Sequence, residues 1–165
     1  MKASIDLAER VGIGSGLSGV DFCCCNGAGM QLLVRFRNVT SMIGVDATES
    51  VVECGRRLCR EEALDDRIRY VLADACHSGP PTASADFIWG EDAWCYVKDK
   101  PKLIAEAARL IRPGGTIAFT YWVEGPAELT GAEAQQLLGL MTFPNIQDIE
   151  AYVRLLSESG CEVRD

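Results

Sequence analysis

Short apolar runs alternate with amphipathic stretches along most of the chain, and turn residues separate them. Five runs predict buried strands, at residues 19–25, 41–45, 68–72, 85–89 and 116–122. Apolar residues three or four positions apart predict helices at residues 4–11, 29–37, 49–62, 101–112, 132–140 and 146–159. Because the strands are apolar on both faces and alternate with helices, we expect an α/β fold with a doubly wound, mostly parallel sheet.

The size and composition of the chain favour one ordinary globular domain over residues 1–165. It has 165 residues, of which 48% are hydrophobic and 24% charged, and no apolar run approaches the ~20 residues of a membrane helix. The N-terminus is charged where a signal peptide is apolar. We therefore expect a cytoplasmic protein that acts away from membranes.

The charge balance argues against nucleic acid as a partner. The chain carries 16 Lys plus Arg and 24 Asp plus Glu, a net charge of −8, without a basic stripe. Eight cysteines are present, but no pair of CxxC motifs and only one histidine accompany them. We therefore expect no metal site, and we interpret the cysteines as small buried apolar side chains.

One glycine-rich segment matches the sequence of a dinucleotide-binding motif, but the predicted elements around it are in the wrong order. Residues 14–19 fit G-x-G-x-x-G, but the segment follows a predicted helix and precedes a predicted strand. A dinucleotide site needs the opposite order, in which the glycines lead into a helix N-terminus that faces the pyrophosphate. An ordinary loop is the better interpretation, although an NAD-linked oxidoreductase remains the third functional hypothesis.

A different series of residues follows the strands in order. Residues 19–29 run from strand to loop to helix, and the next strand ends at Asp46. The third strand is followed by Asp74-Ala75-Cys76, the fourth by Glu91-Asp92-Ala93, and Pro113-Gly114-Gly115 precedes the fifth. Over residues 7–124 this series resembles class I S-adenosylmethionine-dependent methyltransferases, and most closely small-molecule enzymes of the sarcosine and dimethylglycine type.

The resemblance implies a Rossmann-like methyltransferase fold with S-adenosylmethionine as cofactor. Asp46 is placed to accept hydrogen bonds from the ribose, and the alternative is a helix N-cap before Thr48. Asp74 is placed to accept from the adenine amino group, and the alternative is a turn carboxylate. The resemblance puts Asp21 under the loop that holds the methionine ammonium, and the alternative is a structural buried acid. The full set of expected cofactor-binding residues is Asp21, Cys23, Cys25, Gly27, Asp46, Ala47, Asp74, Ala75 and Glu91.

The first loop departs from the family pattern. Where the family carries three alternating glycines, this chain has Cys23, Cys25 and Gly27. Glycine there permits unusual backbone angles and close approach of a ligand, so a β-carbon at position 25 either points at the cofactor or strains the loop. The second functional hypothesis is therefore a non-catalytic binding or scaffold module with weak or no cofactor binding.

Candidate catalytic residues must lie beyond the fourth and fifth strands. They are Glu91, Asp92 and Tyr121, with Trp94, Tyr96 and Trp122 as aromatic faces suited to a sulfonium or an amine. The alternative is that these rings only close the core. His77 lies in a Gly-Pro-Pro loop and is more typical of a solvated loop residue than of a proton carrier. The first hypothesis is methyl transfer to a small-molecule acceptor.

The C-terminal part of the chain determines whether strand 116–122 has a neighbour at the edge of the sheet. The resembled family has seven strands, whereas this chain supplies five and a stub at residues 161–165, so we expect the last strand to be lacking. An open edge on strand 116–122 invites association. We expect the helices at 132–159, the stub, or a second copy in a homodimer to cover it.

Overall fold

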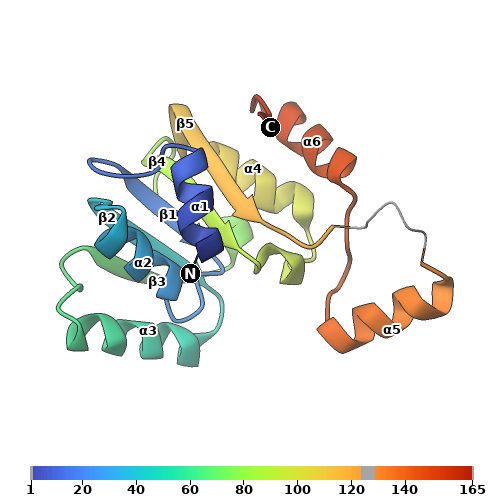
Figure 1. Cartoon of the computed structure of the whole chain (residues 1–165), viewed down its shortest axis with the longest axis horizontal. Coiled ribbons are helices and arrows are strands. Elements are labelled where there is room, and N and C mark those ends of the chain that lie inside the picture. Colours follow the sequence, from blue (N-terminus) through green and yellow to red (C-terminus); the bar gives the residue numbers. More distant parts are fainter. Residues whose placement is uncertain (1, 124–128, 165) are drawn as a thin grey trace.

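A computed structural model describes residues 2–123 and 129–164 of the chain. Five strands form one parallel sheet in the order β3-β2-β1-β4-β5 (Figure 1). The strands are β1 (Ser18–Phe22), β2 (Ser41–Asp46), β3 (Ile68–Leu72), β4 (Ala85–Glu91) and β5 (Ile111–Thr120). The predicted α/β class and parallel sheet are confirmed.

Helices cover both faces of the sheet. They are α1 (Lys2–Arg10), α2 (Ala28–Phe36), α3 (Glu49–Glu61), α4 (Lys100–Leu110), α5 (Gly131–Met141) and α6 (Ile149–Glu158), with short 3₁₀ turns η1 (Ala75–His77) and η2 (Trp94–Tyr96). One core cluster joins the sheet to α1, α2 and α3, and the second joins it to α4 and α6. The two buried faces explain why the strands read as apolar throughout.

The order of the strands reverses between β1 and β4. The chain adds β2 and β3 on one side of β1, then returns to add β4 and β5 on the other side. In open parallel sheets ligands bind beyond the carboxyl ends of the strands at such a reversal. The segments after Phe22 and after Glu91 therefore flank the expected site.

Several predicted boundaries are wrong. Strand β4 runs on to Glu91, so Glu91 ends the strand instead of following it, and α6 begins at Ile149 instead of residue 146. Strand β1 ends at Phe22, so Cys23 and Cys25 lie in the following loop rather than in the strand. Helix α4 ends at Leu110 because the residues before Pro113 turn extended, and the Pro-Gly-Gly segment belongs to β5. Strand β5 ends at Thr120, so Tyr121 and Trp122 follow the strand instead of ending it.

Strand β5 forms one edge of the sheet, next to β4. The part of the C-terminal stub that the structure describes, residues 161–164, forms no strand, so pairing by the stub is wrong there; Asp165 lies outside the described residues. Helix α6 packs on the face of β5 instead, where the Tyr152 ring lies 5.6 Å from that of Phe119. In the residues described, no helix is long and apolar enough to span a membrane.

Candidate functional site

The loop between β1 and α2 is built on three left-handed residues. The φ angles of Cys23, Cys25 and Gly27 are +58°, +51° and +82°. Side chains with a β-carbon rarely adopt this region, and each pays about 1–2 kcal/mol for it. The backbone therefore has the conformation that alternating glycines supply, although two of the three positions hold cysteine.

Gly27 is required by packing as well as by its φ angle. A β-carbon on it would lie 1.9 Å from the Tyr70 hydroxyl. That hydroxyl donates to the carbonyl oxygen of Asn26 at 2.9 Å, so Tyr70 of β3 supports the loop from below. Any larger residue at position 27 must displace this support.

Asp46 fastens the same loop to the end of β2. Its Oδ2 accepts from the backbone N–H of Cys25 at 3.0 Å, and its Oδ1 accepts from that of Thr48 at 2.9 Å. The expected N-cap position is taken by Thr48, whose side chain makes no capping bond. A carboxylate has about four acceptor positions, so two remain for a ligand at this half-buried edge.

Asp21 and Glu91 come together over the start of α2. From the β-carbon position of Gly29, Glu91 Oε2 lies 3.3 Å away, Trp89 Nε1 3.6 Å and Asp21 Oδ2 3.8 Å. Ser4 of α1, itself 3% exposed, donates through Oγ to Glu91 Oε1. We call these five residues the Gly29 cluster.

The electrostatics of the Gly29 cluster are those of crowded acids. Asp21 is 4% exposed, and burial raises its pKa well above the usual range, with Glu91 and then Asp46 adding to the rise. The indole N–H of Trp89 is buried and has no partner among the described residues. A buried donor beside two acids fits an ordered water or a polar ligand group.

Asp92 lies on the other side of Glu91 at the exposed rim. Its φ angle is +52°, and the Thr120 hydroxyl at the end of β5 donates to its Oδ1 at 3.0 Å. The Asp92 N–H donates back to Thr120 Oγ1 at 3.0 Å. This exchange fixes a carboxylate at the carboxyl ends of β4 and β5.

Tyr121 lies on the α4 side of the sheet, away from Glu91. Its ring is 4.6 Å from that of Tyr152 of α6, and burial raises the pKa of its hydroxyl. Lys100 Nζ lies 5.7 Å from the centre of the Tyr121 ring and donates to the carbonyls of Cys95 and Val97. The structure therefore does not bring the three expected catalytic residues together.

The remaining expected residues are spread along the same edge. Asp74 accepts from the N–H of Cys76 at 2.9 Å as the N-cap of η1, which is the turn role; Ala75 is buried behind it. Ala47 and His77 are exposed.

The aromatic residues expected near the site lie in two places. Tyr96 and Trp122 both contact Phe143, and the centres of their rings lie 5.3 and 6.3 Å from the centre of the Phe143 ring. Trp94 is buried against Phe119 at 4.4 Å, so its ring closes the core.

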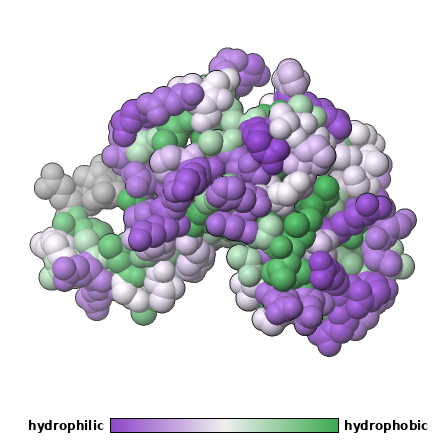
Figure 2. Space-filling model, turned by 180° about the vertical axis from the view of Figure 1, so that it is seen from behind, coloured by the Kyte–Doolittle hydropathy of each residue, from purple (hydrophilic) through white to green (hydrophobic). Residues whose placement is uncertain are grey.

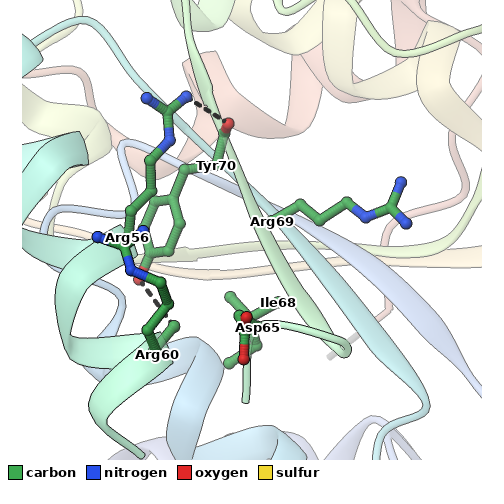
Figure 3. A pocket seen from close by; sticks show the side chains of 7 residues that line it. Arg56, Arg60, Asp65, Ile68, Arg69 and Tyr70 are labelled. Atoms are coloured by element: carbon green, nitrogen blue, oxygen red, sulfur yellow. Dashed lines mark hydrogen bonds between the residues drawn. The ribbon is translucent and has the colours of Figure 1, made fainter. Parts of the chain in front are cut away.

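Two surface hollows of about 330 Å³ lie elsewhere. Figure 3 shows the first, between α3 and β3, where the Arg69 side chain points away from Arg56 and Arg60. Arg56 donates to the Tyr70 carbonyl at 3.0 Å, so it shields the open edge of β3. Because these guanidinium groups diverge, the hollow is a poor anion site.

Several residues of the site were not predicted from the sequence. Thr120 ends β5 at the same edge, but the strand was predicted to run to residue 122, so the rule used for the other candidates missed it. Ser4, Trp89 and Phe143 gave no signal, because a serine inside a helix or an aromatic residue in an apolar run is typical of many folds. Only tertiary packing brings them to the site.

Comparison with known proteins identifies the domain. A family model described as a methyltransferase domain matches residues 20–119, which begin within β1 and end within β5. The chain is similar to methyltransferase GfsG of Streptomyces halstedii, with 28% identity over 95% of the chain and 57% of the relative. Dimethylglycine N-methyltransferase of Parasynechococcus marenigrum is 30% identical over 91% of the chain and 52% of the relative.

A solved structure confirms the fold. Phosphoethanolamine N-methyltransferase 2 of Haemonchus contortus, crystallised with S-adenosyl-L-methionine, superposes with a TM-score of 0.86 at 20% identity. That match covers 96% of this chain and 36% of the other. The chain spans a little over half the length of the curated relatives named above.

Proposed function

The chain belongs to the methyltransferase domain family, and on that premise we propose that it binds S-adenosylmethionine and transfers the methyl group to a small-molecule acceptor. We further propose that residues 1–165 act as one domain. The observation that carries the proposal is the Cys25–Asp46 hydrogen bond, which places the left-handed loop and an acid at one edge of the sheet.

The residues at this edge fit the cofactor. S-adenosylmethionine carries positive charge and no phosphate, and the edge supplies Asp21, Asp46, Asp74 and Glu91 without a basic cradle. The loop provides left-handed backbone, and the buried Trp89 N–H is an unpaired donor. In this proposal Asp46 accepts from the ribose, Asp74 from the adenine amino group, and Asp21 lies beside the ammonium.

The protein has a limited chemical task in this reaction. S-adenosylmethionine supplies, when bound, a methyl group already activated by a positive sulfonium, so the protein mainly aligns the acceptor and excludes water. A base is needed only where the acceptor must lose a proton. Asp92 suits that role better than Glu91, because it is exposed and fixed by Thr120, whereas Glu91 is held by Ser4.

Calorimetric titration with S-adenosylmethionine and with NAD tests the proposal. We expect binding of the first only, and we expect Asp46→Ala to weaken it by about 1.5–3 kcal/mol, the range for a hydrogen bond to a charged group. Asp66→Ala, which removes an exposed acid far from the loop, is the matched control. Unchanged affinity in a folded Asp46→Ala variant contradicts the assignment of Asp46, and binding of neither ligand favours the scaffold hypothesis.

We also propose that the protein forms a homodimer through the side of the molecule that carries β5. β5 is an edge strand of the sheet, and α5 buries none of its residues. Figure 1 shows α5 standing away from the sheet beyond β5, and Figure 2 shows apolar patches between polar ones on this part of the surface. Two-fold pairing covers both surfaces at once.

A further inference from the structure

Side chains from two neighbouring strands hold the backbone of the β1–α2 loop at consecutive residues. Asp46 of β2 accepts from the N–H of Cys25 at 3.0 Å, and Tyr70 of β3 donates to the carbonyl oxygen of Asn26 at 2.9 Å. The first bond fixes the peptide group before Cys25. The second fixes the peptide group that leads into Gly27, whose φ angle is +82°. Residues 25 and 26 are therefore held from both ends.

The Tyr70 side chain reaches the loop through a slot between two glycines. It points from β3 towards α3 (Figure 3), where a β-carbon at Gly55 would lie 2.5 Å from its ring carbons Cε1 and Cζ. A β-carbon at Gly27 would overlap the Tyr70 hydroxyl. The ring is 7% exposed, and the Cys59 sulfur lies 3.7 Å from the hydroxyl oxygen. Because the packing leaves the hydroxyl little room, it fixes the Asn26 carbonyl in one place.

The loop needs this support because two of its left-handed positions hold cysteine. Cys23 and Cys25 have φ angles of +58° and +51°, and a β-carbon disfavours that region. A loop with these side chains and no fastening would populate other conformations. A ligand that binds one conformation loses apparent affinity in proportion to the fraction of the protein that lacks it. Hydrogen bonds that hold the left-handed backbone therefore raise affinity without contacting the ligand.

We propose that Tyr70 is a positioning residue for the cofactor, and that its hydroxyl keeps the cysteine-substituted loop in the conformation that binds. The inference rests on the proposed function, because it takes this loop as part of the cofactor site. Tyr70 belongs to the core cluster between the sheet and helices α1, α2 and α3, so it acts through the Asn26 carbonyl instead of through a contact of its own. No covalent bond changes.

Tyr70→Phe tests the proposal, since it removes the hydroxyl and keeps the ring in the slot. We expect S-adenosylhomocysteine to bind about three- to tenfold more weakly, the effect of one lost neutral hydrogen bond, as measured by titration calorimetry. Amide exchange at Cys25 in the ligand-free protein should become faster. Tyr152→Phe is the matched control, because Tyr152 is 3% exposed and belongs to the core cluster on the opposite face of the sheet. It should change neither quantity.

A double-variant cycle with Cys25→Gly separates positioning of the loop from a general loss of packing. Glycine adopts left-handed angles without strain, so a loop with glycine at position 25 depends less on the Tyr70 hydroxyl. We expect Tyr70→Phe to weaken binding by less than about twofold in the Cys25→Gly background, a non-additive result. A loss of packing alone lowers affinity by the same factor in both backgrounds.

A second pair of variants displaces the ring and retains the hydroxyl, and it serves if Tyr70→Phe fails to fold. Gly55→Ala places a β-carbon 2.5 Å from the Tyr70 ring, which must then shift, so we expect weaker binding of S-adenosylhomocysteine. Gly139→Ala is the matched control. It is the same change within helix α5, at a position where a β-carbon meets nothing within 4 Å, and it should leave binding unchanged.

Failure of this inference and failure of the proposed function give different results. If the wild type binds S-adenosylhomocysteine and Tyr70→Phe binds it equally well, Tyr70 does not position the loop, and the proposed function stands. Equal losses with cysteine and with glycine at position 25 overturn the inference in the same way. If the wild type binds no S-adenosylhomocysteine, both are wrong.

Discussion

The cysteines at positions 23 and 25 are the least expected side chains of the site. Both hold left-handed φ angles that favour glycine, and Cys23 is half-buried, so burial raises the pKa of its thiol to about 12. A thiol with such a pKa is neutral at physiological pH and packs as a small apolar group. The loop therefore has the left-handed backbone that glycine adopts readily, and the β-carbons of the two cysteines make this backbone strained.

Replacing Cys25 by glycine should relieve part of that strain. We expect Cys25→Gly to raise the free energy of unfolding by about 1 kcal/mol and to strengthen cofactor binding, because the backbone N–H that donates to Asp46 is retained. Urea unfolding and calorimetry measure the two effects.

A glycine in regular helix should have the opposite effect. Cys54→Gly, in the interior of α3, is expected to lower the free energy of unfolding by ~0.5 kcal/mol. If Cys25→Gly behaves like Cys54→Gly, or binds the cofactor less well, the strain at position 25 is unimportant.

At the scale of elements, one charged network joins α4 to the loop before β4. Glu106 is 8% exposed and accepts from the Ser78 N–H at 2.9 Å, from the Ser78 hydroxyl at 2.6 Å and from Arg109 Nε and Nη2 at 2.7 Å. Arg109 in turn donates to the Pro80 carbonyl. The loop is thus held by an acid that the sequence presents as an ordinary helix residue.

Removing the charge of Glu106 should destabilise the fold in a pH-dependent manner. The donors around it, Arg109 first, hold its pKa at about 2 against an ordinary value of 4.5. The stabilisation is therefore complete above pH 4.5 and is lost as pH falls towards 2. We expect Glu106→Gln to cost ~2–3 kcal/mol at pH 7 and much less near pH 2.5, measured by urea unfolding.

The control for this experiment is Glu53→Gln on the exposed face of α3. It should change stability by less than ~0.5 kcal/mol at either pH. An equal loss for Glu106→Gln at pH 7 and pH 2.5 shows that the charge itself does not stabilise the loop.

On the scale of the whole molecule, the proposed homodimer would form through the edge of β5 and the exposed helix α5. Leu140 of α5 is 80% exposed, so Leu140→Glu disturbs no packing within the chain. If the dimer uses this side, light scattering should show a dimer for the wild type and a shift towards monomer for the variant. Amide exchange along residues 116–120 should become faster in the variant.

Phe36→Glu provides the matched control, since Phe36 is 65% exposed and belongs to α2, a helix that Figure 1 shows away from β5. It should leave the oligomeric state unchanged. A wild-type monomer at high concentration, with fast exchange along β5, shows that the edge is bare and that the dimer is wrong.

Much of the architecture could be predicted because the signals for it are local. Apolar runs of β-strand length, helical spacing such as that of Leu103, Ile104 and Ala107, and turn residues between them are visible in the sequence, and burial of both sheet faces follows from them. The acids after β1, β2, β3 and β4 could be placed at one edge for the same reason, since parallel strands end together.

The contacts between residues far apart in the sequence were decided only by the tertiary structure. The Ser4–Glu91 bond joins residues 87 positions apart, and the approach of Asp21 to Trp89 and Glu91 depends on β4 returning beside β1. The separation of Tyr121 from Glu91 likewise depends on which face of the sheet each side chain takes. The periodicity of apolar residues along a chain indicates which residues are buried. The partners of a buried group depend on how the elements pack against one another, and the local sequence pattern does not predict that packing.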